Sequence, residues 1–92
     1  MASNSTASTP IALSIAGSDP SCGAGIQADL KTFAACRVFG TAVVSALTAQ
    51  NTLGVKATEA VAPEFVALQV RTLFADMPIA AAKTGMLYSA KV

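Results

Sequence analysis

The sequence contains no histidine and no tryptophan, only two cysteines, and few charged residues. Without histidine, a histidine-based catalytic triad and a histidine-ligated metal site are both excluded. Cys22 and Cys36 are too far apart for a C-x-x-C motif, and two cysteines do not complete a zinc site without further ligands. We expect both to be reduced thiols in a cytoplasmic protein, with Cys36 as a small core residue.

Strong charge and long hydrophobic runs are also missing. The net charge of +1 provides no electrostatic footprint for nucleic acid or an anionic membrane. The longest uncharged apolar run, residues 42–49, is far shorter than the roughly 20 residues that cross a bilayer. Residues 1–10 lack the basic start and apolar stretch of a signal peptide, so we expect them to form a disordered tail.

The apolar content is nevertheless high for so short a chain. Hydrophobic residues make up 53% of the 92 residues and charged residues 12%. A small domain buries only a modest fraction of its surface, so this composition is typical of the interior of something larger. We therefore expect residues 11–92 to be the N-terminal portion of an incomplete domain.

The order of apolar patterns predicts an α/β fold. The expected elements are strand 11–16, helix 24–36, strand 41–49, a polar loop at 50–54, a short outlying strand at 55–61, helix 63–76, strand 79–83 and a further helix from residue 86. With helices between them, the three main strands should be parallel with right-handed crossovers. This is the first part of a doubly wound, mainly parallel sheet.

Both predicted helices carry an apolar stripe at helical spacing. The residues are Ile26, Leu30, Phe33 and Ala34 in the first helix, and Val66, Val70, Leu73 and Phe74 in the second. Arg37 and Gly40 are expected to end the first helix, and Pro63 with Glu64 to begin the second.

A glycine-rich loop connects the first strand to the first helix. Gly17, Gly23 and Gly25 permit close backbone approaches, and Asp19-Pro20-Ser21 has turn chemistry. Gln27 and Asp29 fall near the start of the helix, where hydrogen-bond acceptors are favoured. Such a loop binds small molecules in many α/β folds, although an ordinary strand-to-helix connection explains it equally well.

Gly23-Ala24-Gly25-Ile26-Gln27-Ala28 also fits the dinucleotide fingerprint G-x-G-x-x-[GA]. That fingerprint requires its first glycine directly after the strand and an acidic residue about twenty positions later. Here the fingerprint begins six residues after Gly17, Gln50 stands at the end of the second apolar run, and no acid follows Asp29 until Glu59. An NAD(P)- or FAD-binding module is thus a disfavoured alternative, and no P-loop lysine follows the glycines.

Three separated motifs resemble the hydroxymethylpyrimidine (phosphate) kinases of thiamine biosynthesis, a branch of the ribokinase-like superfamily. They are the stretch from Ala16 to Lys31 (AGSDPS and GAGIQADLK), the stretch from Ala46 to Val55 (ALTAQNTLGV), and Lys83-Thr84-Gly85-Met86-Leu87. The resemblance covers residues 11–87 in register. One departure is Cys22, where the family usually has a small residue, commonly glycine.

The resemblance implies substrate-binding roles for five residues. Gln50 would bind the pyrimidine ring, Met86 would lie at the substrate, and Gly17 and Ala24 would line the pocket. Asp29 would contact the substrate side or cap the helix, and we favour the cap. From the residues alone, Gln50 as a loop side chain and Met86 as a core residue stay open, as does Lys83 facing a phosphate or solvent.

The resemblance further implies ATP- and Mg²⁺-dependent phosphorylation of the hydroxymethyl group and then of the monophosphate. In the family the catalytic base and the anion hole lie nearer the C-terminus, so no catalytic residue and no metal ligand is assigned here. The isolated chain is expected to be inactive, and the full-length enzyme is expected to be a homodimer. The alternatives are a pyridoxal kinase of the same superfamily and a non-catalytic fragment or small interaction protein.

Overall fold

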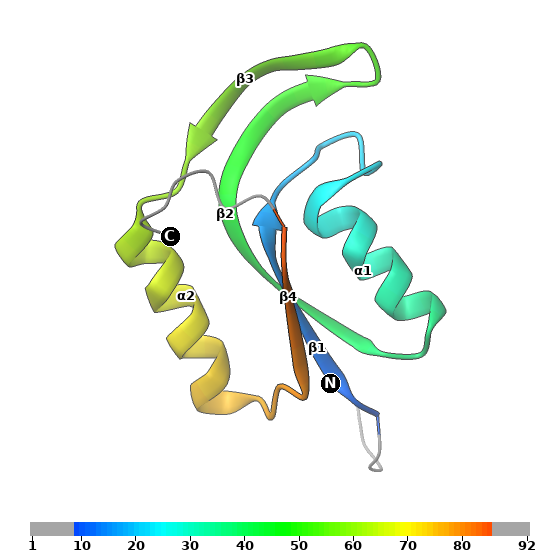
Figure 1. Cartoon of the computed structure of the whole chain (residues 1–92), viewed down its shortest axis with the longest axis vertical. Helices are drawn as coiled ribbons and strands as arrows, with labels where there is room; N and C mark the ends of the chain where they lie inside the picture. Colours follow the sequence, from blue (N-terminus) through cyan, green and yellow to red (C-terminus); the bar gives the residue numbers. More distant parts are fainter. Residues whose placement is uncertain (1–8, 86–92) are drawn as a thin grey trace.

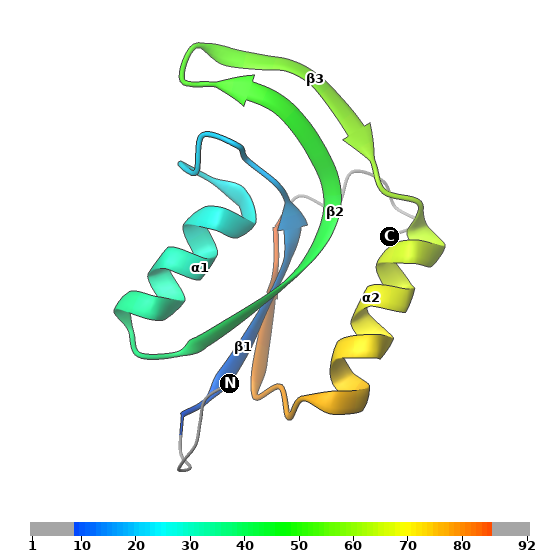
Figure 2. The same ribbon diagram turned by 180° about the vertical axis from the view of Figure 1, so that it is seen from behind.

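The computed structural model describes residues 9–85, which form a four-stranded sheet with helices on its two faces (Figures 1 and 2). The elements are β1 (Ile11–Gly17), α1 (Gly25–Ala35), β2 (Phe39–Asn51), β3 (Gly54–Ala60), α2 (Pro63–Asp76) and β4 (Ala81–Thr84). The predicted helix from residue 86 lies outside the described residues, as does most of the predicted tail.

Strand β1 is the centre of the sheet, whose order is β3-β2-β1-β4. It pairs in parallel with both β2 and β4, so that Leu13 lies opposite Thr41 on one side and Ala82 on the other. The connection through α1 leads from β1 to β2, and the connection through α2 leads back to β4 on the other side of β1. Because such crossovers are right-handed, the two helices lie on opposite faces of the sheet (Figure 1). The predicted doubly wound α/β fold is confirmed.

The buried core lies between β1, β2 and α2. Leu13 and Val43 are fully buried and Val66 of α2 is nearly so. Half-buried apolar side chains surround these three: Ile15, Val61, Val70, Leu73 and Ile79. The carboxamide of Gln69 attaches α2 to β2, accepting from the Val44 N–H at 3.2 Å and donating to the Val44 carbonyl at 3.0 Å. Phe74, predicted on the buried stripe, is exposed instead.

The first helix ends earlier than predicted. It stops at Ala35, and Arg37 adopts a positive φ of 61° as the chain turns toward β2. Cys36 lies at this turn instead of against the sheet, so it is exposed, and its prediction as a core residue was wrong. Gly40 belongs to β2, where a side chain would approach Leu30 and Phe33 of α1 to within 2.7 and 3.0 Å. Its small size lets α1 pack closely against β2. The prediction that Gly40 ends the helix was wrong.

Residues 46–60 form an antiparallel hairpin. β2 continues through Gln50 and Asn51, which were expected in a loop, and pairs with β3 from Ala46–Ala60 to Asn51–Gly54. Asn51 closes the turn by accepting the Leu53 N–H at 2.9 Å. The outlying strand predicted at 55–61 is confirmed, with bounds one residue earlier at each end.

Several large apolar side chains are exposed in residues 9–85. They include Leu47, Leu53 and Val55 on the hairpin, and Phe65, Leu68 and Phe74 on α2. Every residue of β3 and β4 is exposed as well. This agrees with a composition too apolar for a small domain. Neither α1 nor α2 has the length and apolar character of a membrane-spanning helix.

Candidate functional site

A cleft of about 230 Å³ lies where β1, β2 and β4 end and α1 begins. Its lining residues are Ala16, Gly17, Ser18, Asp19, Ala24, Gly25, Asp29, Thr48, Gln50, Lys83 and Gly85. Four of the five predicted substrate-binding residues, Gly17, Ala24, Asp29 and Gln50, are among them. The fifth, Met86, lies outside the described residues. The cleft forms here because the carboxyl ends of neighbouring parallel strands meet at one edge of the sheet.

Asp19 organises the glycine-rich loop. Its carboxylate is almost fully buried and accepts hydrogen bonds from the Ser21 N–H at 2.9 Å, the Ser21 hydroxyl at 2.6 Å and the Gly23 N–H at 3.0 Å. The hydroxyl bond of Ser21 is the main cause that lowers the pKa of Asp19, so the group is ionised at neutral pH. The predicted turn chemistry is confirmed. Cys22 is exposed on this loop, with φ of 64°.

The loop closes tightly against the end of β1. Gly25 begins α1 with φ of +63°, and a side chain there would collide with the Gly17 carbonyl oxygen. Gln27 then bonds back to the loop, accepting from the Asp19 N–H at 2.7 Å and donating to the Ser18 hydroxyl at 2.7 Å. Glycine is therefore required at position 25 both by its backbone angle and by the space available.

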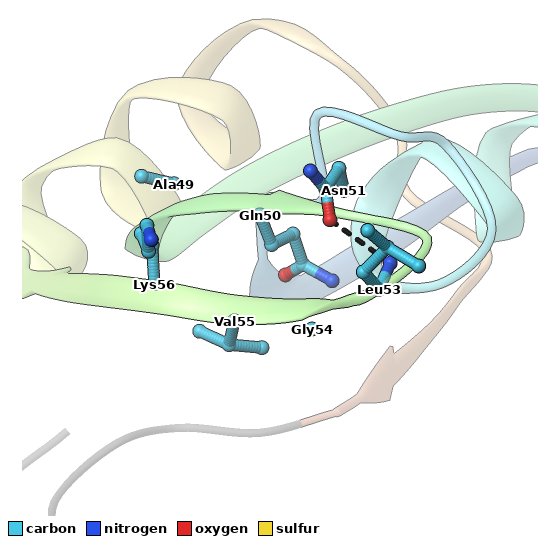
Figure 3. A pocket seen from close by; sticks show the side chains of 7 residues that line it. All are labelled: Ala49, Gln50, Asn51, Leu53, Gly54, Val55 and Lys56. Carbon is cyan, nitrogen blue, oxygen red and sulfur yellow. Dashed lines mark hydrogen bonds between the residues drawn. The ribbon is translucent and has the colours of Figure 1, made fainter.

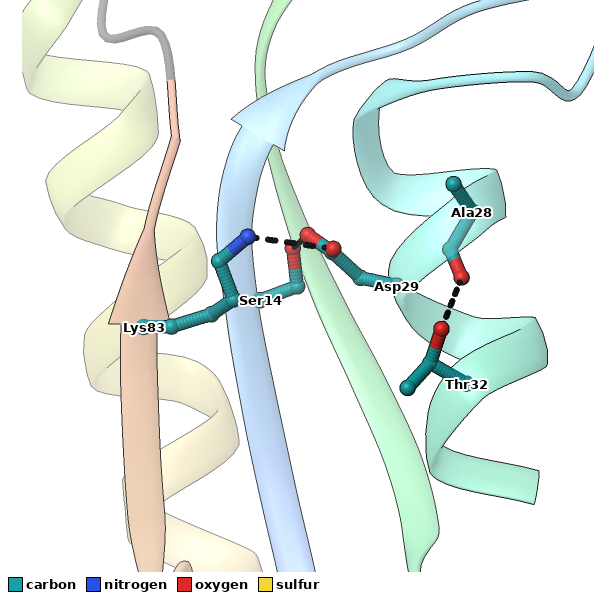
Figure 4. Close-up of polar contacts among 5 residues, drawn as sticks. All are labelled: Ser14, Ala28, Asp29, Thr32 and Lys83. Atoms are coloured by element: carbon teal, nitrogen blue, oxygen red, sulfur yellow. Dashed lines mark hydrogen bonds and ion pairs between the residues drawn. The ribbon is translucent and has the colours of Figure 1, made fainter. Parts of the chain in front are cut away.

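Asp29 links three elements beside the cleft (Figure 4). Its Oδ2 accepts the hydroxyl of the fully buried Ser14 at 2.7 Å, and its Oδ1 lies 3.1 Å from Nζ of Lys83. The Ser14 bond, and then Lys83, lower the pKa of Asp29. The expectation that Asp29 caps the helix was wrong, because Ala24 is the N-cap and no side chain in the described part of the chain caps it. Asp29 lies one turn further along α1 and faces the sheet.

Gln50 lines the cleft from β2. Thr48, two residues before it, has its hydroxyl oxygen 2.7 Å from Oε1 of Gln50 and 2.9 Å from the Ser18 carbonyl oxygen. Gln50 also borders a hollow of about 460 Å³ along the hairpin, whose other lining residues all come from 49–56 (Figure 3). The smaller cleft is the better candidate site, because it gathers side chains from β1, α1, β2 and β4.

Sequence reasoning did not identify Ser14, Ser18 and Thr48 as part of the site. Ser14 and Thr48 interrupt apolar strands, and a polar residue within a buried strand needs a hydrogen-bond partner. That interruption was the available signal. The side chain of Lys83 is half-exposed and paired with Asp29.

Known proteins resemble this chain closely over its length. A profile of the family described as phosphomethylpyrimidine kinase matches residues 19–92. A hydroxymethylpyrimidine/phosphomethylpyrimidine kinase from Synechococcus elongatus is 55% identical over 83 residues, which are 90% of this chain and 32% of that protein. A thiamine biosynthetic bifunctional enzyme from Arabidopsis thaliana is 46% identical over 83 residues, covering 90% of this chain and 16% of that enzyme. The chain thus spans a third or less of these relatives.

Solved structures agree with this similarity. A phosphomethylpyrimidine kinase from Clostridium difficile superposes with a TM-score of 0.84 at 49% identity, covering 88% of this chain and 35% of that one. A pyridoxal kinase from Staphylococcus aureus in complex with AMP-PCP superposes with a TM-score of 0.79 at 34% identity, covering 90% of this chain and 30% of that one.

Proposed function

The chain belongs to the phosphomethylpyrimidine kinase family, and from this premise we propose that its cleft binds hydroxymethylpyrimidine. In this proposal residues 11–92 are the N-terminal, substrate-side portion of a ribokinase-like kinase domain. The complete enzyme transfers phosphate from ATP to 4-amino-5-hydroxymethyl-2-methylpyrimidine and to its monophosphate in thiamine biosynthesis. In this proposal the complete enzyme acts in the cytoplasm as a homodimer.

The observation that carries the proposal is the position of Gln50 in the cleft beside Gly17, Ala24 and Asp29. A carboxamide presents a donor and an acceptor side by side. An aminopyrimidine edge offers the complementary pair, a ring nitrogen beside an exocyclic amine, as adenine does to asparagine or glutamine. Gly17 and Ala24 are small enough for a flat ring to approach the backbone.

Asp29 and Lys83 complete the polar side of the cleft. Both carboxylate oxygens of Asp29 are already engaged, by Ser14 and Lys83, and its low pKa makes it a poor proton acceptor. We therefore assign Asp29 to positioning and leave the catalytic base unassigned. The half-exposed Lys83 ammonium adds a positive charge at the rim, next to the proposed substrate.

ATP is the proposed phosphoryl donor because a pyridoxal kinase of similar structure carries the ATP analogue AMP-PCP. Phosphoryl transfer in kinases also uses Mg²⁺ to neutralise charge on the phosphates. Within residues 9–85 no three acidic, cysteine or histidine side chains come together in a way that would hold a metal ion. We assign none of these residues to Mg²⁺.

Pyridoxal is the second candidate substrate, favoured by the structural likeness to pyridoxal kinase. Like the pyrimidine, it carries a hydroxymethyl group on a nitrogen heteroaromatic ring. It has no exocyclic amine beside a ring nitrogen, so the paired donor and acceptor of Gln50 would be only partly used. Gln50 therefore favours the pyrimidine. The dinucleotide alternative is weaker still, because β1 ends at Gly17, well before Gly23.

The test uses a chimera in which this chain replaces the segment that it matches in the Synechococcus elongatus relative. We expect the chimera to phosphorylate hydroxymethylpyrimidine with ATP and to prefer it over pyridoxal in direct competition. A folded chimera that prefers pyridoxal, or that phosphorylates neither compound, would contradict the proposal. A saturable change in NADH fluorescence on titration with the chimera, at micromolar concentration, would favour the dinucleotide alternative. The isolated 92-residue chain should show no phosphoryl transfer.

A further inference from the structure

The Thr48 hydroxyl lies between two oxygen atoms, and it carries one proton. Its Oγ1 is 2.9 Å from the Ser18 carbonyl oxygen and 2.7 Å from Oε1 of Gln50. Both oxygens are acceptors, and neither carries a proton of its own. Thr48 therefore cannot satisfy both contacts while the Gln50 oxygen faces it.

Turning the Gln50 carboxamide by 180° about its last torsion removes this conflict. The turn exchanges the amide oxygen and nitrogen, which occupy nearly the same space. An amide N–H of Gln50 then donates to the Thr48 oxygen, and the Thr48 proton goes to the Ser18 carbonyl. All three groups are satisfied in one chain of hydrogen bonds, and the other N–H and the oxygen of Gln50 stay free for a ligand.

The Ser18 carbonyl is a fixed acceptor for this chain. The Ser18 N–H donates to the Ala46 carbonyl of β2 at 2.9 Å, and its hydroxyl accepts from Gln27 at 2.7 Å. The next peptide N–H, that of Asp19, is held by the same Gln27 side chain. With Ser18 tied to both β2 and α1, its carbonyl direction determines where the Thr48 proton points.

We propose that Thr48 is a positioning residue that fixes which amide atom of Gln50 meets each atom of the ligand. This inference rests on the proposed function, because it concerns how Gln50 reads a pyrimidine edge. A carboxamide held in this orientation presents its N–H and its oxygen in the order that matches a 4-aminopyrimidine, whose edge is a ring-nitrogen acceptor beside an amine donor. The same orientation does not match the 4-oxo analogue, in which a protonated ring nitrogen would face the amide N–H and a carbonyl would face the amide oxygen.

The test measures kcat/KM of the chimera for hydroxymethylpyrimidine and for its 4-oxo analogue. Thr48→Val removes the hydroxyl at nearly constant shape, and Thr48→Ser keeps it. Loss of one orienting hydrogen bond should lower the preference for the 4-amino compound about 3- to 10-fold in Thr48→Val. Thr48→Ser should retain the preference. Thr58 lies opposite Thr48 on exposed β3, so Thr58→Val is the matched control and should change nothing.

A double-mutant cycle with Gln50→Ala separates positioning from a general structural effect. If Thr48 acts through Gln50, Thr48→Val should have no further effect on the preference once Gln50 is alanine. An equal effect in both backgrounds, or an unchanged preference in Thr48→Val, would overturn the inference. Neither result touches the proposed function, which fails separately if the parent chimera does not phosphorylate hydroxymethylpyrimidine.

Discussion

The ammonium nitrogen of Lys83 lies 3.1 Å from a carboxylate oxygen of Asp29, joining β4 to α1 across 54 positions of the sequence. The other carboxylate oxygen accepts the hydroxyl of Ser14 from β1. The two bonds of Asp29 differ in their surroundings, because Ser14 is fully buried and the Lys83 side chain is 52% exposed. We expect them to differ in energy as well.

Removing the Asp29 carboxylate should destabilise the protein more than removing the Lys83 charge. Asp29→Ala leaves the buried Ser14 hydroxyl without its acceptor, which should cost about 1–3 kcal/mol of unfolding free energy. Lys83→Met breaks only a solvent-exposed ion pair and should cost less than about 1 kcal/mol. Urea unfolding of the chimera measures both. Equal losses would show that the ion pair, and not the Ser14 bond, dominates.

The contribution of Asp29 to stability should depend on pH in the acid range. The Ser14 hydroxyl, and then Lys83, hold the folded pKa of Asp29 below its ordinary value of 3.8. The folded state therefore binds this proton more weakly than the unfolded state. The stabilisation is complete above the ordinary pKa and is lost as pH falls through the folded one. The stability difference between the chimera and Asp29→Asn should be constant near neutral pH and shrink below about pH 4. A constant difference into strong acid would contradict this.

Two glycines of the same loop should differ in how well they tolerate substitution by alanine. Gly25→Ala places a side chain at φ of +63° and against the Gly17 carbonyl, so it should cost more than the roughly 1–2 kcal/mol of a left-handed alanine. Among the residues that the structure describes, the side chain of Gly23→Ala would meet only Asp19 Oδ2, at 3.7 Å, so it should be tolerated. Thermal unfolding and kcat/KM of the two chimera variants test this. A Gly25→Ala variant as stable as Gly23→Ala would disprove the tight closure of the loop.

Gln50→Ala should impair use of the pyrimidine and leave use of ATP nearly unchanged. Two lost hydrogen bonds, each worth about 0.5–1.5 kcal/mol, correspond to about a 5- to 140-fold fall in kcat/KM for hydroxymethylpyrimidine. The KM for ATP should stay the same. Lys56→Ala is the control, since Lys56 borders only the hairpin hollow. If kcat/KM did not change, Gln50 would be an ordinary strand residue and the pocket would lie elsewhere.

The isolated 92-residue chain should associate in solution. Large apolar side chains are exposed on the hairpin and on α2. Within residues 9–85, the four exposed residues of β4 pair only with β1. Unpaired strand edges and apolar patches both favour association. Sedimentation velocity at increasing concentration should show growing oligomers of the isolated chain, whereas the chimera should keep one sedimentation coefficient. A chain that remains monomeric at high concentration would contradict this expectation.

The sequence was most informative where a pattern is local. The strand–glycine loop–helix order and the apolar stripes predicted the doubly wound fold, and the family resemblance predicted that Gly17, Ala24 and Gln50 line one pocket. What failed was set by distant partners. Asp29 bonds Ser14 and Lys83, which are 15 and 54 positions away, so its proximity to the helix start was misleading.

Distant partners also explain the errors at Gly40 and Gln50, whereas the error at Cys36 has a local cause. Gly40 resembles a helix terminator in the sequence, but its small size serves the packing of Leu30 and Phe33. Gln50 resembles a loop residue because the polar stretch after residue 49 hides the hairpin with β3. Cys36 was placed in the core from residue type alone, whereas the left-handed turn at Arg37 brings it to the surface.

The central position of β1 has a consequence for synthesis on the ribosome. Of the four described strands β1 is made first, yet one of its two neighbours is β4, and Ala12 lies 69 positions before its partner Ala81. At translation rates of about 5–20 residues per second, the β4-facing edge of β1 waits about 3 to 14 s for its partner. During that interval its N–H and C=O groups are open to other chains. The nascent chain should therefore depend on chaperones most strongly before β4 emerges.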